Sequence, residues 1–330
     1  MPTWEDCVTK KGRALITGIA GFAGSYLAEL LLSKSIKVFG TIAPGERTDN
    51  IDHILRDIET EEIDIVDRQG MGNFIGSAKP NFIFHLAAMA SVGQSIQNER
   101  LTYHINIFGS LNMLESAILL GRQLKKIVMI SSADCYGVFE PPTKILRENQ
   151  SLNPVSPYGI SKATMEYLAN YYVRQYKIPA VIARSFNHAG PRQSDFFVVP
   201  SFCRQIAMIE NGKMKPQMYV GDLSVKRDIS DVRDIVQGYY LISQAGVAGQ
   251  KYQLSSGRAI SIQQILDNLL SLSPARIEVV IDKNLLRKSD IPILRGNSGK
   301  ARKELGWTRK YKFQRTLKDT LQYWREKVGH

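Results

Sequence analysis

The sequence has few cysteines and no long apolar run, and each shortage excludes a class of protein. Its 330 residues include three cysteines, Cys7, Cys135 and Cys203, without the spacing of a metal site. So small and odd a set argues against a disulfide framework and fits a reducing compartment, so we expect a cytoplasmic protein without a bound metal. No run of 18 or more apolar residues occurs, and the opening stretch, MPTWEDCVTKKGR, is polar. We therefore expect neither a membrane span nor a secretory signal.

Acidic residues are also scarce relative to basic ones. The chain has 31 Asp and Glu against 43 Lys and Arg, a formal net charge of +12, and the stretch from Asp282 to Arg315 has eleven basic residues against three acidic ones. Such a stretch is either a solvated basic surface or the surroundings of an anionic ligand. It carries no nucleic-acid-binding motif and no ladder of aromatic and basic residues, so we expect no nucleic-acid partner. A small phosphorylated ligand stays open.

The chain does contain a regular alternation of short apolar segments and helical patterns. Helical patterns occur in FAGSYLAELLLSK, near residues 100–120, and from about Pro157 onward. Near-continuous apolar strands that alternate with helices predict an α/β fold with a Rossmann-like, doubly wound parallel sheet. The predicted strands are RALITG (13–18), IKVFGT (36–41), EEIDIVD (61–67), NFIFHLAA (81–88), KKIVMISS (125–132) and PAVIARSFN (179–187).

The segment GIAGFAG places Gly18, Gly21 and Gly24 between the first strand and its helix. Glycines at these positions allow a tight turn and let backbone N–H groups approach a pyrophosphate at the helix N-terminus. A tight turn without a ligand is the alternative. Because the pattern stands between a strand and a helix at the start of a βαβ run, it predicts dinucleotide binding, with Phe22 and Ala23 beside the glycines.

The end of the second strand bears on which dinucleotide binds. An acid about 20 residues after the first glycine usually holds the adenosine ribose 2′-hydroxyl. Here the position is Thr41, followed by IAPGER, so the strand end is neutral and Arg47 lies close by. A neutral end with a nearby cation accommodates a 2′-phosphate, which favours NADPH over NADH. The alternative for Arg47 is a solvated loop cation.

The chain is expected to divide into three parts. Residues 1–12 are an N-terminal extension, and residues 13–190, which hold the glycine loop, are predicted to form an NAD(P)-binding Rossmann domain to which the chain returns from its C-terminal half. In residues 191–330, prolines, glycines and charges interrupt shorter elements. This pattern predicts a smaller, mixed α/β region that faces the substrate.

The segment NPVSPYGISKATMEYL holds the strongest chemical signal. Ser156 suits a helix N-cap and Pro157 the first helical turn, which puts Tyr158 and Lys162 one turn apart on one helix face. A phenol with a pKa of ~10 is a poor acid at neutral pH, and we expect the ammonium group to lower that pKa. Tyr158 would then protonate a carbonyl oxygen that receives hydride, and Ser132 would bond the same oxygen.

A tyrosine and a lysine at this spacing are, by themselves, usually a partly buried tyrosine beside a solvated lysine. Together with the glycine loop and a serine at a strand end, in this order, they predict an NAD(P)-dependent oxidoreductase.

These segments, with FHLAA, NIFGSLNMLE and RSFNHAGPRQ, resemble the extended short-chain dehydrogenases/reductases that act on nucleotide sugars. The resemblance runs from about residue 13 to the C-terminus. GDLSVKRDISDVRDIVQGYY and LLRKSDIPILRGNSGKARKELGW resemble the branch of GDP-mannose 4,6-dehydratase and GDP-4-keto-6-deoxy-D-mannose reductase, and ISSADCYG resembles the reductase more. The resemblance implies a homodimer through the helices near 100–120 and 157–176. It also implies further cofactor contacts at Asp64, Ile65, Leu86, Ala87 and Ala88.

The stretch ISSADCYG distinguishes two reactions. The resemblance implies that a dehydratase places an acid and a base directly after the strand-end hydroxyl. Here Ala133 is inert, and Asp134 is one methylene shorter than glutamate. Reduction of a ketone needs only Ser132, Tyr158, Lys162 and a reduced nicotinamide.

We therefore predict reduction of GDP-4-keto-6-deoxy-D-mannose to GDP-D-rhamnose, in nucleotide-sugar and surface-polysaccharide biosynthesis, with Asp134 on a sugar hydroxyl. The alternatives are a dehydratase, a 4-epimerase that retains NAD, and a non-catalytic NAD(P)-binding protein.

The resemblance also implies where the nucleotide binds. Asn187 and Arg227 match family residues on the diphosphate, and the planar fork of arginine can bond two phosphate oxygens. Arg287 and Asp290 match a family Arg-Pro-x-Glu segment that contacts phosphate and ribose, although this chain has aspartate for the glutamate. Arg192 is a further candidate. The alternative for each arginine is a surface cation.

Overall fold

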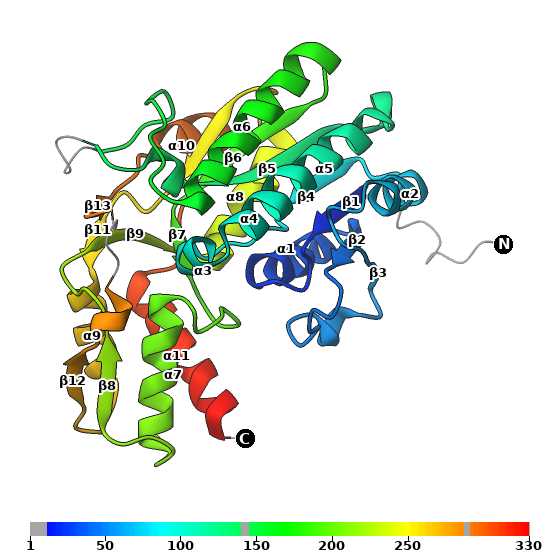
Figure 1. The fold of residues 1–330 in the computed structure, drawn as a ribbon. Coiled ribbons are helices and arrows are strands. Elements are labelled where there is room, and N and C mark those ends of the chain that lie inside the picture. The colour runs from blue at the N-terminus through cyan, green and yellow to red at the C-terminus, as the bar shows by residue number, and fades with distance from the viewer. Residues whose placement is uncertain (1–11, 140–144, 287–290, 330) are drawn as a thin grey trace.

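The computed structural model describes residues 12–139, 145–286 and 291–329. Its centre is a seven-stranded sheet in the order β10-β6-β5-β4-β1-β2-β3, in which all neighbours are parallel (Figure 1). The strands are β1 (Arg13–Thr17), β2 (Lys37–Ile42), β3 (Ile58–Glu62), β4 (Phe82–His85), β5 (Lys126–Ser132), β6 (Ala180–Ser185) and β10 (Lys251–Leu254).

Helices cover both faces of this sheet, because successive residues of a buried strand point to opposite faces. Ala14 and Ile16 of β1 pack with residues of α1 and α8, whereas Leu15 packs with residues of α2, α5 and α6. The predicted α/β fold with a doubly wound parallel sheet is confirmed. The covering helices are α1 (Phe22–Ser33), α2 (Arg68–Ala78), α5 (Gly109–Ile118), α6 (Pro157–Tyr176), α8 (Val232–Ala245) and α10 (Gly299–Leu305).

A smaller mixed part lies beside the carboxyl ends of the large sheet, at lower left in Figure 1. One of its sheets has the order β11-β9-β13, with β7 paired to β9, and a second consists of β8 and β12. Three helices pack around a separate apolar core. The elements are β7 (Asn187–Ala189), β8 (Gln217–Val220), β9 (Lys226–Asp231), β11 (Ala259–Ser261), β12 (Glu278–Ile281), β13 (Ile293–Leu294), α7 (Val198–Glu210), α9 (Ile262–Leu270) and α11 (Phe313–Gly329).

The two parts are not consecutive in the chain. β10, α8 and α10 come from the C-terminal half, yet they complete the large sheet and one of its helical layers. The predicted boundary at residue 190 stays a prediction, and the predicted extension lies outside the described residues except for Gly12. Within the described ranges, no helix combines the length and the apolar character needed to cross a membrane.

The third strand differs from its predicted position. EEIDIVD was predicted to form it, but β3 ends at Glu62, and Asp67 caps α2 by accepting bonds from the N–H groups of Gln69 and Gly70. Ile63 and Ile65 are buried in the core under α2 and α5 although they lie outside the strand. The alternating apolar pattern therefore marked a buried loop.

Candidate active site

The glycine loop forms the turn between β1 and α1. Gly18 has a φ of +68°, and the N–H groups of Gly18 and Ile19 both donate to the Thr41 carbonyl at 3.1 Å. A Cβ on Gly24 would lie 2.3 Å from the Gly18 carbonyl oxygen, so only glycine fits there. Gly21 precedes α1 and offers no side-chain cap. The first N–H groups of α1 are thus available to an anion, and the loop fits a dinucleotide pyrophosphate.

Backbone contacts bring the end of β4 beside this loop. Thr17 Oγ1 accepts bonds from the N–H groups of Leu86 and Ala87, each at 3.1 Å. A Cβ on Gly18 would lie 3.1 Å from the Ala87 Cα, so the two backbones are in close contact. His85 bonds Thr17 through Nδ1 at 3.0 Å, and burial lowers the pKa of His85 to about 3. His85 is therefore a neutral core histidine.

The other cofactor candidates lie at the same edge of the sheet. Ile65 is buried, and Asp64 is exposed with its Oδ1 accepting from the Val66 N–H at 3.0 Å. Ala88 is half-buried after β4. The structure thus brings them to the carboxyl edge of the large sheet but gives their side chains different exposure.

Two opposite charges follow β2. Arg47 is 85% exposed and pairs with Asp49 at 2.7 Å. Glu46 Oε2 accepts from the Ala43 N–H at 3.2 Å, which holds a carboxylate on the turn after the strand. Our sequence reasoning treated this strand end as free of acid because it took Thr41 as the deciding position and, in the following IAPGER, gave weight only to Arg47. The proline and glycine of IAPGER were the available sign of a turn that folds back.

The catalytic candidates gather where β5 ends against α6. Ser156 caps α6 by accepting from the Gly159 N–H at 3.1 Å, and it sets the start of the helix as predicted. Tyr158 and Lys162 are both buried. Lys162 Nζ donates to the Ile130 carbonyl at 2.9 Å and lies 6.0 Å from the centroid of the Tyr158 ring.

The phenol of Tyr158 has a different acidity from the one predicted. Burial raises the pKa of Tyr158 above its ordinary value, the Asp134 carboxylate raises it further, and a hydrogen bond with Ser132 opposes both. The predicted lowering by Lys162 is not seen, because burial dominates. Burial also lowers the pKa of Lys162 to about 8. The phenol is therefore protonated at neutral pH, which is the form that donates a proton, but it is a weaker acid here than a free tyrosine.

The two residues after Ser132 face different surroundings. Ala133 is 1% exposed and packs in an apolar cluster with Tyr136 and Phe186. Asp134 is half-buried and accepts a hydrogen bond from Ser132 Oγ at 2.8 Å. The inert position is thus part of the core, and of the two residues only Asp134 lies beside the catalytic candidates.

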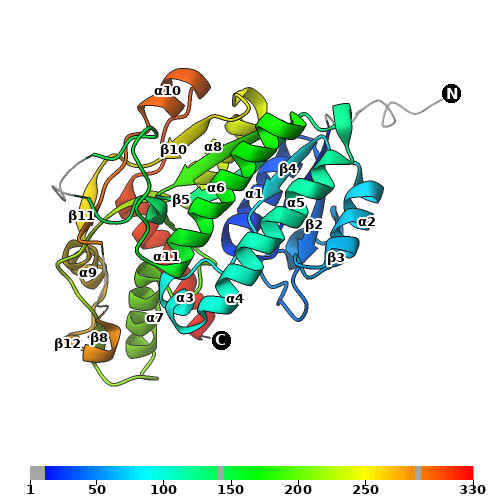
Figure 2. The same ribbon diagram turned by 45° about the horizontal axis from the view of Figure 1, so that its top comes forward.

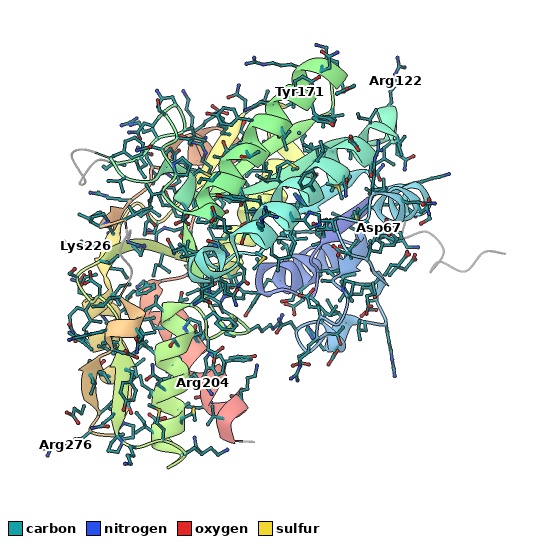
Figure 3. The ribbon with its side chains drawn as sticks, in the orientation of Figure 1. Asp67, Arg122, Tyr171, Arg204, Lys226 and Arg276 are labelled. Carbon is teal, nitrogen blue, oxygen red and sulfur yellow. The ribbon has the colours of Figure 1, made fainter. Side chains whose placement is uncertain are left out.

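The substrate candidates fall into three groups. Asn187 on β7 is paired with Ile229 on β9, two residues from Arg227, whose Nη1 donates to the Ile291 carbonyl at 2.6 Å. Figure 3 labels Lys226, the neighbour of Arg227, on this small sheet. Arg192 instead packs on α1.

Arg192 pairs with Glu29 of α1 at 2.7 Å and lies over the ring of Tyr26. Arg287 and Asp290 lie outside the described residues.

With this geometry established, residues 15–320 match the sequence profile of the family described as GDP-mannose 4,6 dehydratase. The chain belongs to this family. Membership confirms the predicted resemblance to the extended short-chain oxidoreductases of nucleotide sugars.

Individual relatives carry two activities at similar identity. The GDP-6-deoxy-D-mannose reductase of Pseudomonas aeruginosa is 27% identical over 316 residues, which cover 96% of this chain and 98% of the relative. A GDP-mannose 4,6-dehydratase of Vibrio cholerae is 27% identical over 338 residues, 90% of each chain. The structure of RMD from Pseudomonas aeruginosa complexed with NADPH matches with a TM-score of 0.83 and 26% identity, covering 96% of this chain and 100% of that one. Identity alone does not separate reduction from dehydration.

Sequence reasoning missed a buried ion pair behind the catalytic groups. Glu166 of α6 and Arg184 of β6 pair at 2.6 Å with almost no solvent exposure. Two signals could have found it. Glu166 stands one turn beyond Lys162 on the same helix face, and Arg184 is a charged residue inside an apolar strand.

Proposed function

We propose that this protein reduces the C4 ketone of GDP-4-keto-6-deoxy-D-mannose to GDP-D-rhamnose with NADPH. The observation that carries the proposal is the site at the end of β5. Tyr158 is buried and protonated beside Ser132 and Lys162, while the two dehydratase positions hold a buried methyl group and a short acid. The match to a GDP-6-deoxy-D-mannose reductase supports it.

The residues of the chain supply the proton and hold the reacting oxygen. Bound reduced nicotinamide would supply hydride to C4. Ser132 would bond the C4 oxygen, and Tyr158, whose phenol is protonated at neutral pH, would give its proton to that oxygen as the oxygen gains negative charge from hydride transfer. Lys162 would stabilise the resulting phenolate. Its pKa of about 8 leaves it largely charged at neutral pH.

The cofactor would lie across the glycine loop, with its pyrophosphate at the N-terminus of α1. The close backbone packing at Gly18 and Gly24 supports this position. The exposed Arg47 would bond the 2′-phosphate of NADPH, while Glu46 on the same turn would oppose it. NADH therefore remains a usable second cofactor in this proposal. The remaining proposed cofactor contacts are Phe22, Ala23, Asp64, Ile65, Leu86, Ala87 and Ala88.

The diphosphate of the sugar nucleotide would lie over the small sheet. Asn187 and Arg227 stand on adjacent strands, and Arg227 is two residues from Ile229, the register partner of Asn187. The other proposed substrate contacts are Arg287, Asp290 and Arg192. The ion pair of Arg192 with Glu29 of α1 would put Arg192 nearer the cofactor side.

A homodimer would bury an apolar surface on the outer helices. Leu101, Phe108, Tyr167 and Tyr171 are 49%, 53%, 66% and 55% exposed, and they lie on α4 (Glu99–Tyr103), the π-helical turn His104–Phe108, and α6. Figure 2 shows α4, α5 and α6 side by side on one face, and Figure 3 places Tyr171 at its rim. Patches of this kind mark protein–protein contacts. Sedimentation should give twice the chain mass. A cytoplasmic location is part of the same proposal, in keeping with the buried free thiols of Cys135 and Cys203.

A dehydratase is the second candidate, and Asp134 favours it. Its carboxylate bonds Ser132 and raises the pKa of Tyr158, so it lies close enough to take part in proton transfer. The match to a GDP-mannose 4,6-dehydratase supports this candidate.

The decisive experiment supplies each sugar separately. GDP-4-keto-6-deoxymannose with NADPH or NADH should gain two hydrogens, and NMR of the product should show the D-rhamno configuration. GDP-mannose with NADP⁺ should be recovered unchanged. Loss of water from GDP-mannose at a rate comparable to ketone reduction would identify a dehydratase instead.

A further inference from the structure

A row of buried polar residues crosses three strands just below the catalytic groups. Ser131, Arg184 and Gln253 are side by side on β5, β6 and β10, with Ser131 and Gln253 each paired to Arg184 in the register. None is more than 2% exposed. Glu166 of α6 closes the row, because Arg184 donates to both of its carboxylate oxygens at 2.6 Å.

One end of this row holds the catalytic strand to its helix. Ser131 Oγ donates to Glu166 Oε1 at 2.6 Å. The residues on either side of Ser131 are Ile130, whose carbonyl accepts from Lys162, and the catalytic candidate Ser132. Three consecutive residues of β5, Ile130 to Ser132, therefore contact three turns of α6, at Lys162, Glu166 and Tyr158 respectively. A shift of Ser131 would move the other two contacts with it.

The other end of the row reaches the loops of the substrate side. The Tyr136 hydroxyl accepts from Arg184 Nη1 at 2.6 Å and from Gln253 Nε2, and it donates to the Arg147 carbonyl at 2.8 Å. Gln253 Oε1 accepts from the Asn297 N–H at 2.9 Å. The loops around residues 147 and 297 are thus bonded to the same buried polar row.

These loops lead directly to the proposed phosphate contact. The Leu146 N–H donates to the Arg295 carbonyl at 2.9 Å, next to β13. In β13, Leu294 is paired with Arg227 of β9. A continuous set of contacts therefore joins the arginine proposed for the nucleotide to the strand that carries Ser132.

Stability alone gives no reason for such a buried charge pair. Desolvation of two ions offsets much of their attraction, and apolar replacements of similar volume are often as stable. The five-donor fork of arginine does, however, fix several partners in one geometry. Geometry is what the catalytic site needs, because a misplacement of ~1 Å can cost on the order of 10²-fold in rate.

We propose that Glu166 and Arg184 are positioning residues, which hold Ser132 and the Ile130 carbonyl in register with Tyr158 and Lys162, and that Tyr136 connects them to the nucleotide loops. The proposal rests on the proposed function only in taking those four groups as the reacting site.

The first test removes the link between β5 and Glu166. Ser131→Ala leaves the ion pair intact, so folding should survive. We expect kcat for ketone reduction to fall about tenfold, with KM and the Kd of NADPH within about twofold of wild type. Ser243→Ala is the matched control, because Ser243 is equally buried but donates only to the Tyr240 carbonyl of its own helix. It should leave kcat unchanged.

The second test disconnects the loops. Tyr136→Phe removes the hydroxyl at which three bonds meet and keeps the ring. We expect KM for the nucleotide sugar to rise about fivefold or more, with kcat within about threefold, which is the reverse of Ser131→Ala.

Ser131→Thr is the rescue variant for the first test. It keeps a hydroxyl and should restore most of the kcat lost in Ser131→Ala.

The opposite split in kcat and KM separates positioning from a structural role. Lower melting temperatures with unchanged kcat and KM in both variants would overturn the proposal. Failure of wild type to reduce the 4-keto sugar would instead overturn the proposed function. The same comparison would then use dehydration of GDP-mannose, or GDP affinity by calorimetry, where only Tyr136→Phe should weaken binding.

Discussion

The proposed cofactor side and the proposed substrate side of this molecule are built from different groups. On the cofactor side, backbone N–H groups and glycines of the turn before α1 would form most of the binding surface. On the substrate side, polar side chains such as Asn187 and Arg227 stand on short strands of a small sheet. In this proposal the backbone surface would accept any ligand with the same phosphates, whereas the side chains would determine which sugar nucleotide binds. The difference explains how one fold is used with many substrates.

The largest expected effect falls where the two sides meet. Tyr158→Phe removes the proton donor but no cofactor contact of the glycine loop. We expect kcat to fall by ~10²–10⁴-fold while the Kd of NADPH stays near normal. Stopped-flow measurement of ketone reduction checks the expected kcat, and fluorescence titration with NADPH checks the expected Kd. A variant with nearly full kcat would remove Tyr158 from the role of general acid.

The next largest effect is expected for a glycine substitution, which tests whether the backbone of the glycine loop binds the cofactor. Gly24→Ala places a methyl group 2.3 Å from the Gly18 carbonyl oxygen, and this backbone atom cannot move away. We expect the Kd of NADPH to rise by about 10²-fold, since displacement of the loop would cost hydrogen bonds to the pyrophosphate, each worth about 1.5–3 kcal/mol for a charged acceptor. Calorimetry measures it.

The matched control for that change is Gly76→Ala, in the exposed part of α2, where an added Cβ meets nothing within 4 Å. It should leave the Kd unchanged and raise the free energy of unfolding by about 0.5–1 kcal/mol, because alanine favours a helix. Equal Kd values for both variants would show that the loop does not hold the cofactor closely.

Arg47→Ala tests the side chain proposed to favour NADPH. The substitution should weaken the binding of NADPH more than the binding of NADH, by roughly 1.5–3 kcal/mol, the typical size of a charge-assisted hydrogen bond. Because Arg47 is 85% exposed, the smaller value is the better expectation. Kd values for both cofactors should be compared with those of Glu46→Gln, which should shift the ratio toward NADPH. Equal losses for the two cofactors would assign selection to another residue.

The smallest effect is a pH dependence. The pKa of Lys162 is lowered to about 8, so kcat for reduction should decline above that pH as the ammonium group is lost. Stability should change in the opposite direction. Between pH 8 and the ordinary pKa of lysine, the unfolded chain binds more protons, so the free energy of unfolding rises with pH. Lys162→Met should abolish the rise, which chemical denaturation at pH 7 and pH 9.5 can check.

The sequence predicts the features that depend on neighbouring residues better than those that depend on distant ones. GIAGFAG and YGISK predict their positions because each depends on local turns and helix spacing. The third strand was misplaced because buried loop residues Ile63 and Ile65 imitate strand alternation. Arg192 was assigned by resemblance, and only the fold shows that it packs on α1.

Long-range contacts account for what local patterns did not show. The pair of Glu166 and Arg184 joins a helix and a strand 18 residues apart, and Gln253 reaches the same site from β10. Burial reversed the expected acidity of Tyr158, because desolvation depends on tertiary packing. Local sequence patterns therefore predicted which residues are the candidates, whereas the burial and hydrogen-bond partners of those residues could be seen only in the structure.

The place of β10 in the large sheet has a consequence for synthesis of the chain. A ribosome would have made residues 13–190 before residues 251–254 emerge, so β6 would wait as an open edge strand. All six residues of β6 are buried in the finished protein. Such an edge is a template for aggregation until it is covered. A fragment truncated near residue 190 should therefore precipitate or bind chaperones, even though it contains the whole glycine loop and both Tyr158 and Lys162.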